Sequence, residues 1–513
     1  MGKMIPDSLL EEFSGFVEVN MGLCFPKEKR ADLEKGLRSA CAQFGCDNEE
    51  AFARHVMSAD LSKRYIEMLA SALTVGETYF FREKIALDAF EHVVLSELIS
   101  TRSGAERNLR IWSAGCSSGE EPYTIAMMLK MLLPELKEWN VTILATDINP
   151  HFMEKALKGV YTRWSFRDVP GSINDRFFVK QGESFEILPE IKEMVTFSYL
   201  NLMKDDYPSL MNNTNAMDVI FCRNVLMYFS PETIKSVARN FNRCLTDGGR
   251  LIVSQTELND EYFQGFGKES HAGALLFRKR EARPEKKEYR LPKVAAMPET
   301  GRFRTNTTQK AHPPQPLPSK EGLIYQSSPL AGEGKGGGGI CDEAPAELLY
   351  ENARYSFEKR EYSRTEELLV RLIEGRPGNA EALSLLARVC ANQGRLDDAL
   401  SYIEKAIKAD KMNPGRHYLH SAILKEKGLK QQAIEALKKA VYLDADFALA
   451  YFAMGNLALG SGNMVEAERH FNSALSLLKK RAHDDILPES EGMTAGRLME
   501  LIESMKWRKK EPR

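Results

Sequence analysis

The stretch Arg110-Ile-Trp-Ser-Ala-Gly-Cys-Ser-Ser-Gly-Glu-Glu-Pro-Tyr-Thr-Ile-Ala126 decides the fold of the central part of the chain. Its apolar start, residues 109–114, predicts a strand, and residues 120–132 predict the helix after it. Between them, Gly115 and Gly119 let the backbone come close to a ligand because no Cβ stands in the way. This turn predicts a ligand site but does not by itself choose a cofactor.

The same alternation of strand and helix continues along the chain. Strand followed by helix, repeated, requires right-handed crossovers and predicts a mostly parallel, doubly wound α/β sheet. The further strands are expected at residues 141–146, 195–198, 217–222 and 250–254, and the further helices at 150–157 and 231–245.

Acidic residues beside the glycine turn narrow the choice of ligand. Glu120 and Glu121 stand at the helix start, which disfavours a pyrophosphate and suits a cationic group such as the amino group of a methionine moiety. Asp147 ends the next strand, where an acid commonly accepts hydrogen bonds from ribose hydroxyls. A helix N-cap is the alternative role for Asp147 alone. Together the three acids favour S-adenosyl-L-methionine over a dinucleotide.

Composition sets broad limits on the protein. The chain has 513 residues, so several folded units are expected. Of these residues 28% are charged, but the net charge is only −2, so we expect no nucleic-acid partner. Its eight cysteines form no CxxC pair and join no histidine cluster, which favours buried thiols over disulfides or a metal site. With neither a signal peptide nor a long apolar run, we expect a cytoplasmic protein without membrane insertion.

A repeat of 34 residues marks the C-terminal part. Three columns of small residues predict stacked helical hairpins of the tetratricopeptide type, with a weaker unit before them. Such arrays bind peptides or proteins on a concave face, and dimerisation is the alternative use. The columns are Gly394, Gly428 and Gly462; Ala399, Ala433 and Ala467; and Ala406, Ala440 and Ala474.

These patterns divide the chain into five parts. Residues 1–74 predict a small helical domain, and 75–280 the α/β domain. Residues 281–344, with the run PPQPLP and many glycines, predict a flexible linker, a proline-rich ligand being the alternative. Residues 345–480 hold the repeats, and 481–513 form a C-terminal tail.

Five segments, in this order, give the chain its resemblance to the CheR-type chemoreceptor methyltransferases. They are LTVGETYFFR at 73–82, the stretch 114–126, TDIN at 146–149, YLNL at 199–202 and FCRNVLMYF at 221–229. The resemblance covers about residues 9–277. It implies a class I S-adenosyl-L-methionine-dependent enzyme that methylates glutamate side chains on the cytoplasmic helices of methyl-accepting chemotaxis receptors. One departure is Gly76, where many relatives have asparagine.

The resemblance also implies roles for single residues. By position, Thr78 and Arg82 would lie beside the cofactor and the reaction centre, and Tyr228 would line the methyl-transfer site. For Arg82 the alternative is a structural salt bridge, and for Tyr228 it is a position in the core. The cofactor would be held by Gly115 in the turn against it, Glu120 or Glu121 at the methionine end, Asp147 at the ribose, Asn201 and Leu202 on either side of the adenine, and Arg223 and Asn224 at its border.

Two accessory parts follow from the same resemblance. A basic helix would face the acidic receptor, with an ordinary solvated face as the alternative. An antiparallel β insertion at about 177–197 would be a place for a receptor tail to add a strand. The basic residues are Lys27, Lys29, Arg30, Lys35 and Arg38.

The expected chemistry needs orientation more than a base. A glutamate carboxylate is already ionised near pH 7, so in-line positioning should dominate, and the planar fork of Arg82 can orient two oxygens. Two rival functions remain: a repeat scaffold with a vestigial methyltransferase, or a methyltransferase acting on a small molecule or a protein that is not a receptor. The partner of the repeats stays unknown.

Overall fold

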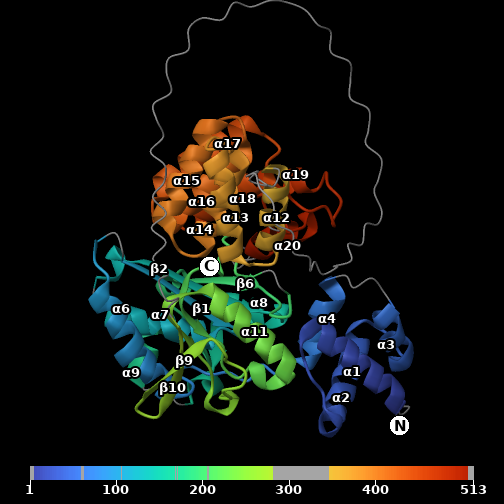
Figure 1. The fold of residues 1–513 in the computed structure, drawn as a ribbon. Coiled ribbons are helices and arrows are strands. Elements are labelled where there is room, and N and C mark those ends of the chain that lie inside the picture. Colours follow the sequence, from blue (N-terminus) through green and yellow to red (C-terminus); the bar gives the residue numbers. More distant parts are fainter. Residues whose placement is uncertain are drawn as a thin grey trace, which may run out of the picture.

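The computed structural model describes residues 5–58, 63–104, 107–133, 135–167, 169, 171–204, 207–280, 346–490 and 492–506. Figure 1 shows N-terminal helices in blue, a central sheet with its helices in cyan and green, and C-terminal helices in orange and red. The predicted linker, 281–344, lies outside the described residues.

The N-terminal part is a group of four helices: α1 (Asp7–Met21), α2 (Arg30–Gln43), α3 (Glu49–Ser58) and α4 (Lys63–Leu73). Phe13, Leu37 and Val56 meet in its core, as their helical spacing requires. The backbone N–H of Cys24 donates to the carbonyl of Tyr228 at 2.7 Å, which joins this part to the central domain.

The central sheet has seven strands in the order β6-β2-β1-β7-β8-β10-β9. The strands up to β8 run parallel, which confirms the predicted doubly wound fold, and β10 and β9 add an antiparallel edge. The strands are β1 (Asn108–Ala114), β2 (Asn140–Asp147), β6 (Val195–Tyr199), β7 (Met217–Phe221), β8 (Leu245–Ile252), β9 (Phe266–His271) and β10 (Ala274–Lys279).

Helices cover both faces of this sheet. Ile111 packs with Tyr123 of α7 (Glu120–Leu132) and Ala156 of α8 (Pro150–Lys158) on one face. The next residue of the strand, Trp112, packs with Phe241 of α11 (Pro231–Cys244) on the other. Three shorter helices, α5 (Lys84–Ala89), η2 (Phe90–Leu95) and α6 (Ser96–Thr101), precede β1. The parallel strands therefore all end at one edge, where loops build a site.

The antiparallel insertion differs from its predicted extent. Its three strands, in the order β3-β5-β4, are β3 (Val160–Thr162), β5 (Ser184–Ile187) and β4 (Phe178–Gln181). α9 (Gly171–Phe177) and α10 (Pro189–Lys192) lie beside them. Assigning Val195 and Phe197 to the insertion was wrong, because they belong to β6 and pair in parallel with β2. Their alternation fits either sheet, so it does not identify the partner strand.

The C-terminal part confirms the repeat. Its helix pairs are α12 (Ala346–Glu358) with α13 (Tyr362–Gly375), α14 (Ala380–Asn392) with α15 (Leu396–Ala409), α16 (Pro414–Glu426) with α17 (Lys430–Leu443), and α18 (Ala448–Leu459) with α19 (Met464–Leu478); α20 (Ala495–Lys506) follows. Gly394, Gly428 and Gly462 take φ of 79°, 77° and 75° between paired helices, a left-handed conformation that glycine adopts without cost. Arg360 takes φ of 58° in the first, weaker pair.

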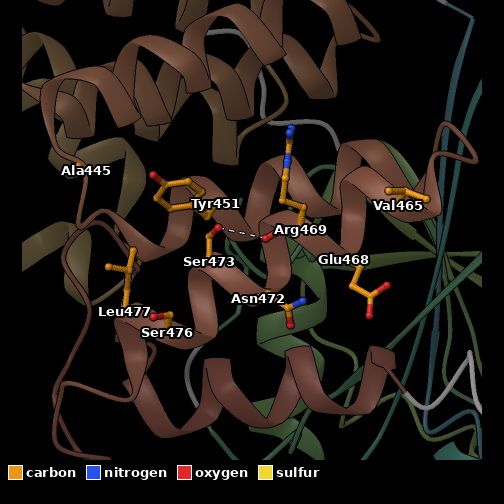
Figure 2. A pocket seen from close by; sticks show the side chains of 9 residues that line it. All are labelled: Ala445, Tyr451, Val465, Glu468, Arg469, Asn472, Ser473, Ser476 and Leu477. Atoms are coloured by element: carbon orange, nitrogen blue, oxygen red, sulfur yellow. Dashed lines mark hydrogen bonds between the residues drawn. The ribbon is translucent and has the colours of Figure 1, made fainter.

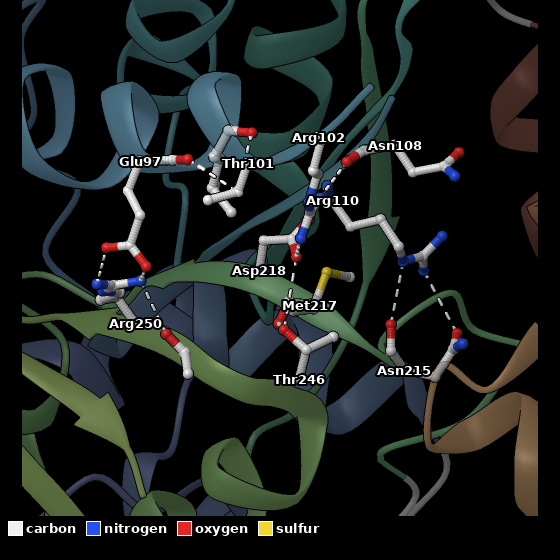
Figure 3. A network of polar contacts seen from close by, with 12 residues as sticks. Glu97, Thr101, Arg102, Asn108, Arg110, Asn215, Met217, Asp218, Thr246 and Arg250 are labelled. Atoms are coloured by element: carbon white, nitrogen blue, oxygen red, sulfur yellow. Dashed lines mark hydrogen bonds and ion pairs between the residues drawn. The ribbon is translucent and has the colours of Figure 1, made fainter. Parts of the chain in front are cut away.

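The repeats dock on the sheet at the edge where the parallel strands begin. Arg110 of β1 pairs with Glu426 of α16, and the two side chains are only 11% and 5% exposed. The amide of Asn140 donates to the carbonyl of Glu426 at 3.1 Å, and the N–H of Leu210 to the side chain of Asn392 at 2.9 Å. Figure 3 shows Arg110 reaching Asn215, next to the pair of Arg102 with Asp218. The array is thus held away from the ends of the parallel strands.

Candidate active site

A pocket of about 560 Å³ opens where the parallel strands end, against helices α2 and α4. This volume is typical of small-molecule sites. Ten of the eleven predicted site residues line it, and Glu120 does not. The ten are Thr78, Arg82, Gly115, Glu121, Asp147, Asn201, Leu202, Arg223, Asn224 and Tyr228.

The glycine turn after β1 forms one wall of the pocket. Gly115 has φ of 79°, and a Cβ there would lie 2.4 Å from Val225 Cγ2, so only glycine fits. Ser117 takes φ of 48° and donates its N–H to Asp147 Oδ2 at 2.8 Å. Its buried hydroxyl has no partner among the described residues, although buried polar atoms nearly always have one. This hydroxyl marks a place where a polar ligand atom fits.

Asp147 stands at the end of β2 and is 9% exposed. Burial raises the pKa of its carboxyl group, while backbone N–H groups of Asn149 and Ser117 oppose that rise. The N-cap of α8 is Asn149, whose side chain accepts from the N–H groups of His151 and Phe152. The alternative role of Asp147 as the N-cap is therefore wrong, and its remaining lone pairs can accept from a diol.

The two glutamates at the start of α7 point in different directions. Glu121 lines the pocket, accepts from Ser113 Oγ at 2.7 Å and pairs with Arg223 at 3.2 Å. Burial raises its pKa, and the Arg223 charge opposes the rise. Glu120 instead accepts from the hydroxyls of Ser118 and Ser165 at 2.8 and 3.0 Å, away from the pocket. We therefore keep Glu121 and leave Glu120 out of the candidate site.

Arg82 and Tyr228 stand close together on the pocket wall. Arg82 Nη1 donates to the carbonyl of Glu77 at 2.5 Å, and Arg223 donates to the carbonyl of Arg82. Within the described parts of the chain Arg82 joins no ion pair, so its charge is available to an anion. Tyr228 is half-buried; burial raises the pKa of its hydroxyl and the nearby Arg82 opposes the rise.

Two side chains that line the pocket make contacts that the sequence did not predict. The side-chain amide of Asn201 donates a hydrogen bond to the backbone carbonyl of Asn20 at 2.8 Å, which joins the pocket to α1. Phe152 of α8 lines the pocket and explains the departure at Gly76, where a Cβ would lie 2.3 Å from the ring. The sequence carried one sign of this contact, the glycine at 76, because a glycine can mark a place where a neighbouring side chain needs the space. Nothing in one sequence identifies that neighbour as Phe152.

The basic residues between Lys27 and Arg38 were expected either to face an acidic receptor or to form an ordinary solvated surface, and they differ in their surroundings. Lys29 and Lys35 line the mouth of the pocket, and Lys29 Nζ lies 5.7 Å from the ring centre of Tyr228. Arg30 pairs with Glu11 at 3.3 Å and Arg38 with Glu34 at 2.6 Å, as on an ordinary solvated surface.

A second hollow, of about 700 Å³, lies on the last helix pair. Figure 2 shows it between Tyr451 and the polar side chains of α19, with Ser473 donating to the carbonyl of Arg469 at 3.1 Å. Across the described ranges, no group of three or more histidine, cysteine, aspartate or glutamate side chains is placed to hold a metal ion. In the same ranges no helix has the length and apolarity to cross a membrane.

Comparison with known proteins agrees with this geometry. Residues 76–271 match the profile "CheR methyltransferase, SAM binding domain", and 356–423 and 416–447 match tetratricopeptide repeats. Chemotaxis protein methyltransferase 2 of Vibrio cholerae is 31% identical over 257 residues, covering 50% of this chain and 86% of the relative. The chain belongs to the CheR methyltransferase family. It is an S-adenosyl-L-methionine-dependent methyltransferase fused to tetratricopeptide repeats.

Two further relatives of this CheR protein carry different functional names. A chemotaxis protein methyltransferase of Borreliella burgdorferi is 32% identical, over 48% of this chain and 88% of its own length. The "probable biofilm formation methyltransferase WspC" of Pseudomonas aeruginosa is 29% identical over 60% of this chain and 72% of its own length. Among solved structures, MamA of Desulfovibrio magneticus is 20% identical over 27% of this chain and 79% of its own, with a TM-score of 0.26.

Proposed function

We propose that this CheR protein is a protein-glutamate O-methyltransferase that acts from the cytoplasm on the cytoplasmic helices of methyl-accepting chemotaxis receptors. The observation that carries the proposal is the set of charges that line one pocket. The largely buried carboxylates of Glu121 and Asp147 line it together with Arg82 and Lys29, and Arg82 and Lys29 both lie near Tyr228. The first pair suits a cofactor with a cationic amino acid end and a ribose, and the second suits an acidic substrate.

The residues of the pocket fit the cofactor. Glu121 would accept from the amino group, Asp147 from the ribose hydroxyls, and the unpaired Ser117 hydroxyl offers one more polar contact. Asn201 and Leu202 would flank the adenine. When bound, S-adenosyl-L-methionine supplies a methyl group on a positively charged sulfur.

The rest of the chemistry is orientation. Arg82, fixed by its bond to the Glu77 carbonyl, would hold the substrate carboxylate through its remaining N–H groups. A tight pair would weaken the nucleophile, so Arg82 should orient the carboxylate rather than bind it strongly. Tyr228 lines the same pocket, and residues of α2 line it as well. No strong base is required, since the acceptor is already ionised.

Two receptor classes follow from the relatives. Their printed names, chemotaxis methyltransferases on one side and a biofilm-formation methyltransferase on the other, support a receptor of either signalling pathway. In both cases the small sheet β3-β5-β4 offers an edge strand to a receptor tail.

Incubating the full chain with tritiated S-adenosyl-L-methionine and membranes of the source organism tests the proposal. We expect base-labile label on a receptor-sized band. Arg82→Ala should lose the label yet still bind the cofactor in calorimetry. Label on RNA or a metabolite would refute the substrate, and absence of cofactor binding by the unaltered chain would favour the scaffold alternative.

A further inference from the structure

The C-terminal segment of the chain lies on the inner face of the repeat array. The first helices of successive pairs, α12 with α14 and α14 with α16, contact one another, which places them on the inner side of the stack. Repeat arrays use this concave side for binding. After α19 the chain turns back: the N–H of Leu487 donates to the carbonyl of Met493 at 2.9 Å, and that of Ala495 to the carbonyl of Asp485 at 2.8 Å.

Two side chains of this returning segment enter the array. Glu489 pairs with Arg388 of α14. A Cβ added at Gly415 would lie only 2.5 Å from Glu489 Oε1. The carboxylate therefore fits against α16 because residue 415 is glycine. Leu487 is 3% exposed and belongs to the same apolar cluster as Tyr418 and Leu449. The contact therefore consists of one apolar and one acidic anchor, two residues apart.

Both partners give up conformational stability to make this contact. Glu489 takes φ of 63°, a left-handed conformation that non-glycine residues rarely adopt. Gly415 lies in the first turn of α16, where glycine is a weak helix former. At the matching positions one repeat away, 381 and 449, the chain has glutamate and leucine. A segment held in a strained conformation is easier to displace than its contacts alone suggest.

Arg388 favours an acidic occupant at this place. Arg354, Glu351 and Glu381 lie near it, since all of them act on the Tyr350 hydroxyl, but Arg354 is already paired with Glu351 at 3.0 Å. Arg416, near the start of α16, pairs with Asp410, which follows α15. Arg388, whose side chain is 14% exposed, is therefore the charge that meets the carboxylate of the incoming segment.

We propose that the inner face formed by α14 and α16 is a binding site for an acidic peptide segment of a partner protein, and that residues 483–490 occupy it until that partner displaces them. The recognised pattern is an aliphatic residue followed two positions later by an acid, as in Leu487-Pro-Glu489. The aliphatic side chain takes the place of Leu487, and the carboxylate pairs with Arg388. This site is separate from the methyl-transfer pocket and does not rest on its proposed substrate.

A fluorescently labelled peptide with the sequence of residues 483–494 tests the site on the full chain. Because the chain's own segment competes, the unaltered protein should bind the peptide weakly. Glu489→Ala removes the competitor's anchor and should tighten binding by roughly tenfold, about the weight of one charge-assisted hydrogen bond. Adding Arg388→Ala should abolish that gain, and a peptide with glutamine in place of its first glutamate should bind weakly throughout.

Hydrogen exchange of the Leu487 and Ala495 amides gives the second readout, and far-UV circular dichroism checks that the repeat helices of each variant are folded. We expect faster exchange in Glu489→Ala, or in Glu489→Gln should the alanine variant fail to fold. If these amides stay protected, the ion pair does not hold the segment and the proposal fails. It fails equally if the segment is released but the peptide does not bind, or if Arg388→Ala leaves the gain intact.

Discussion

Adding a single methyl group at Gly76 should weaken cofactor binding through Phe152. A Cβ at this position would lie 2.3 Å from Cζ of the Phe152 ring and 2.6 Å from Cε1. Phe152 lines the pocket and Gly76 does not, so the methyl group would push the ring toward the cofactor. Backbone strain plays no part, because Gly76 is not among the residues with positive φ.

The size of the effect follows from the overlap. Normal carbon–carbon contact is about 3.5 Å, so the ring must move by roughly 1 Å. Overpacking of this kind costs about 1–3 kcal/mol. If most of that cost falls on the bound state, the dissociation constant for S-adenosyl-L-methionine rises roughly 5- to 150-fold. Any part that falls on the free protein lowers its melting temperature instead.

Calorimetric titration with the cofactor and a thermal melt measure both effects in Gly76→Ala. The double variant Gly76→Ala, Phe152→Leu should recover part of the affinity, since the smaller side chain makes room. Gly15→Ala, with nothing within 4 Å of its added Cβ, is the matched control: it should bind the cofactor as the unaltered chain does, and its melting temperature should not fall, because alanine is the better helix former within α1. Unchanged affinity and melting temperature in Gly76→Ala would refute the packing argument, and so would a double variant weaker than the single one.

Three further predictions concern charge. In Asp147→Asn the cofactor should bind roughly tenfold or more weakly, because charge-assisted hydrogen bonds to the ribose are lost; equal affinity would rule out the ribose contact. Burial raises the Asp147 pKa, so the cofactor affinity of the unaltered chain should fall as the pH drops through that pKa, because a proton then competes with the ribose donors. Calorimetry across pH should show this dependence in the unaltered chain and not in Asp147→Asn. Glu426→Ala leaves the buried Arg110 without its carboxylate partner. In scanning calorimetry the repeats and the sheet domain should then unfold in separate transitions, while cofactor affinity stays unchanged. A single unchanged transition would mean that the ion pair does not hold the repeats on the sheet domain.

How far the sequence predicts this molecule depends on the range of the interaction involved. The strand from 109 to 114 and the helix from 120 to 132 came within a residue of β1 and α7, because apolar periodicity is local. The choice between Glu120 and Glu121 was not local. Adjacent helix residues point about 100° apart, and the rotation of α7 is set by packing against the sheet.

Pairings between distant segments were the other gap. The sequence assigned residues 195–197 both to a strand of the parallel sheet and to the antiparallel insertion, and only the pairing with β2 decides between the two. The contact between Phe152 and Gly76 likewise joins residues far apart in the chain. An acidic tail pairing with Arg388 leaves no local trace, since exposed and paired acids look alike in sequence. What remained unpredicted thus depends on tertiary contacts that composition and periodicity do not encode.

The position of the array limits what partner binding can do to catalysis. The repeats hold the sheet where its parallel strands begin, through Arg110 and Glu426, while the cofactor pocket opens where those strands end. Among the described residues, Arg497 of α20 reaches across: it donates to the carbonyl of Tyr199 at 3.3 Å and lies 5.6 Å from the centre of the Tyr199 ring, and the next residue, Leu200, lines the pocket. The hydrogen bond contributes about 1 kcal/mol, so its loss alone would change cofactor affinity roughly fivefold. Raising the local concentration of substrate by holding a receptor-associated partner can exceed that by orders of magnitude. The repeats should therefore act on methylation mainly through where they place the enzyme.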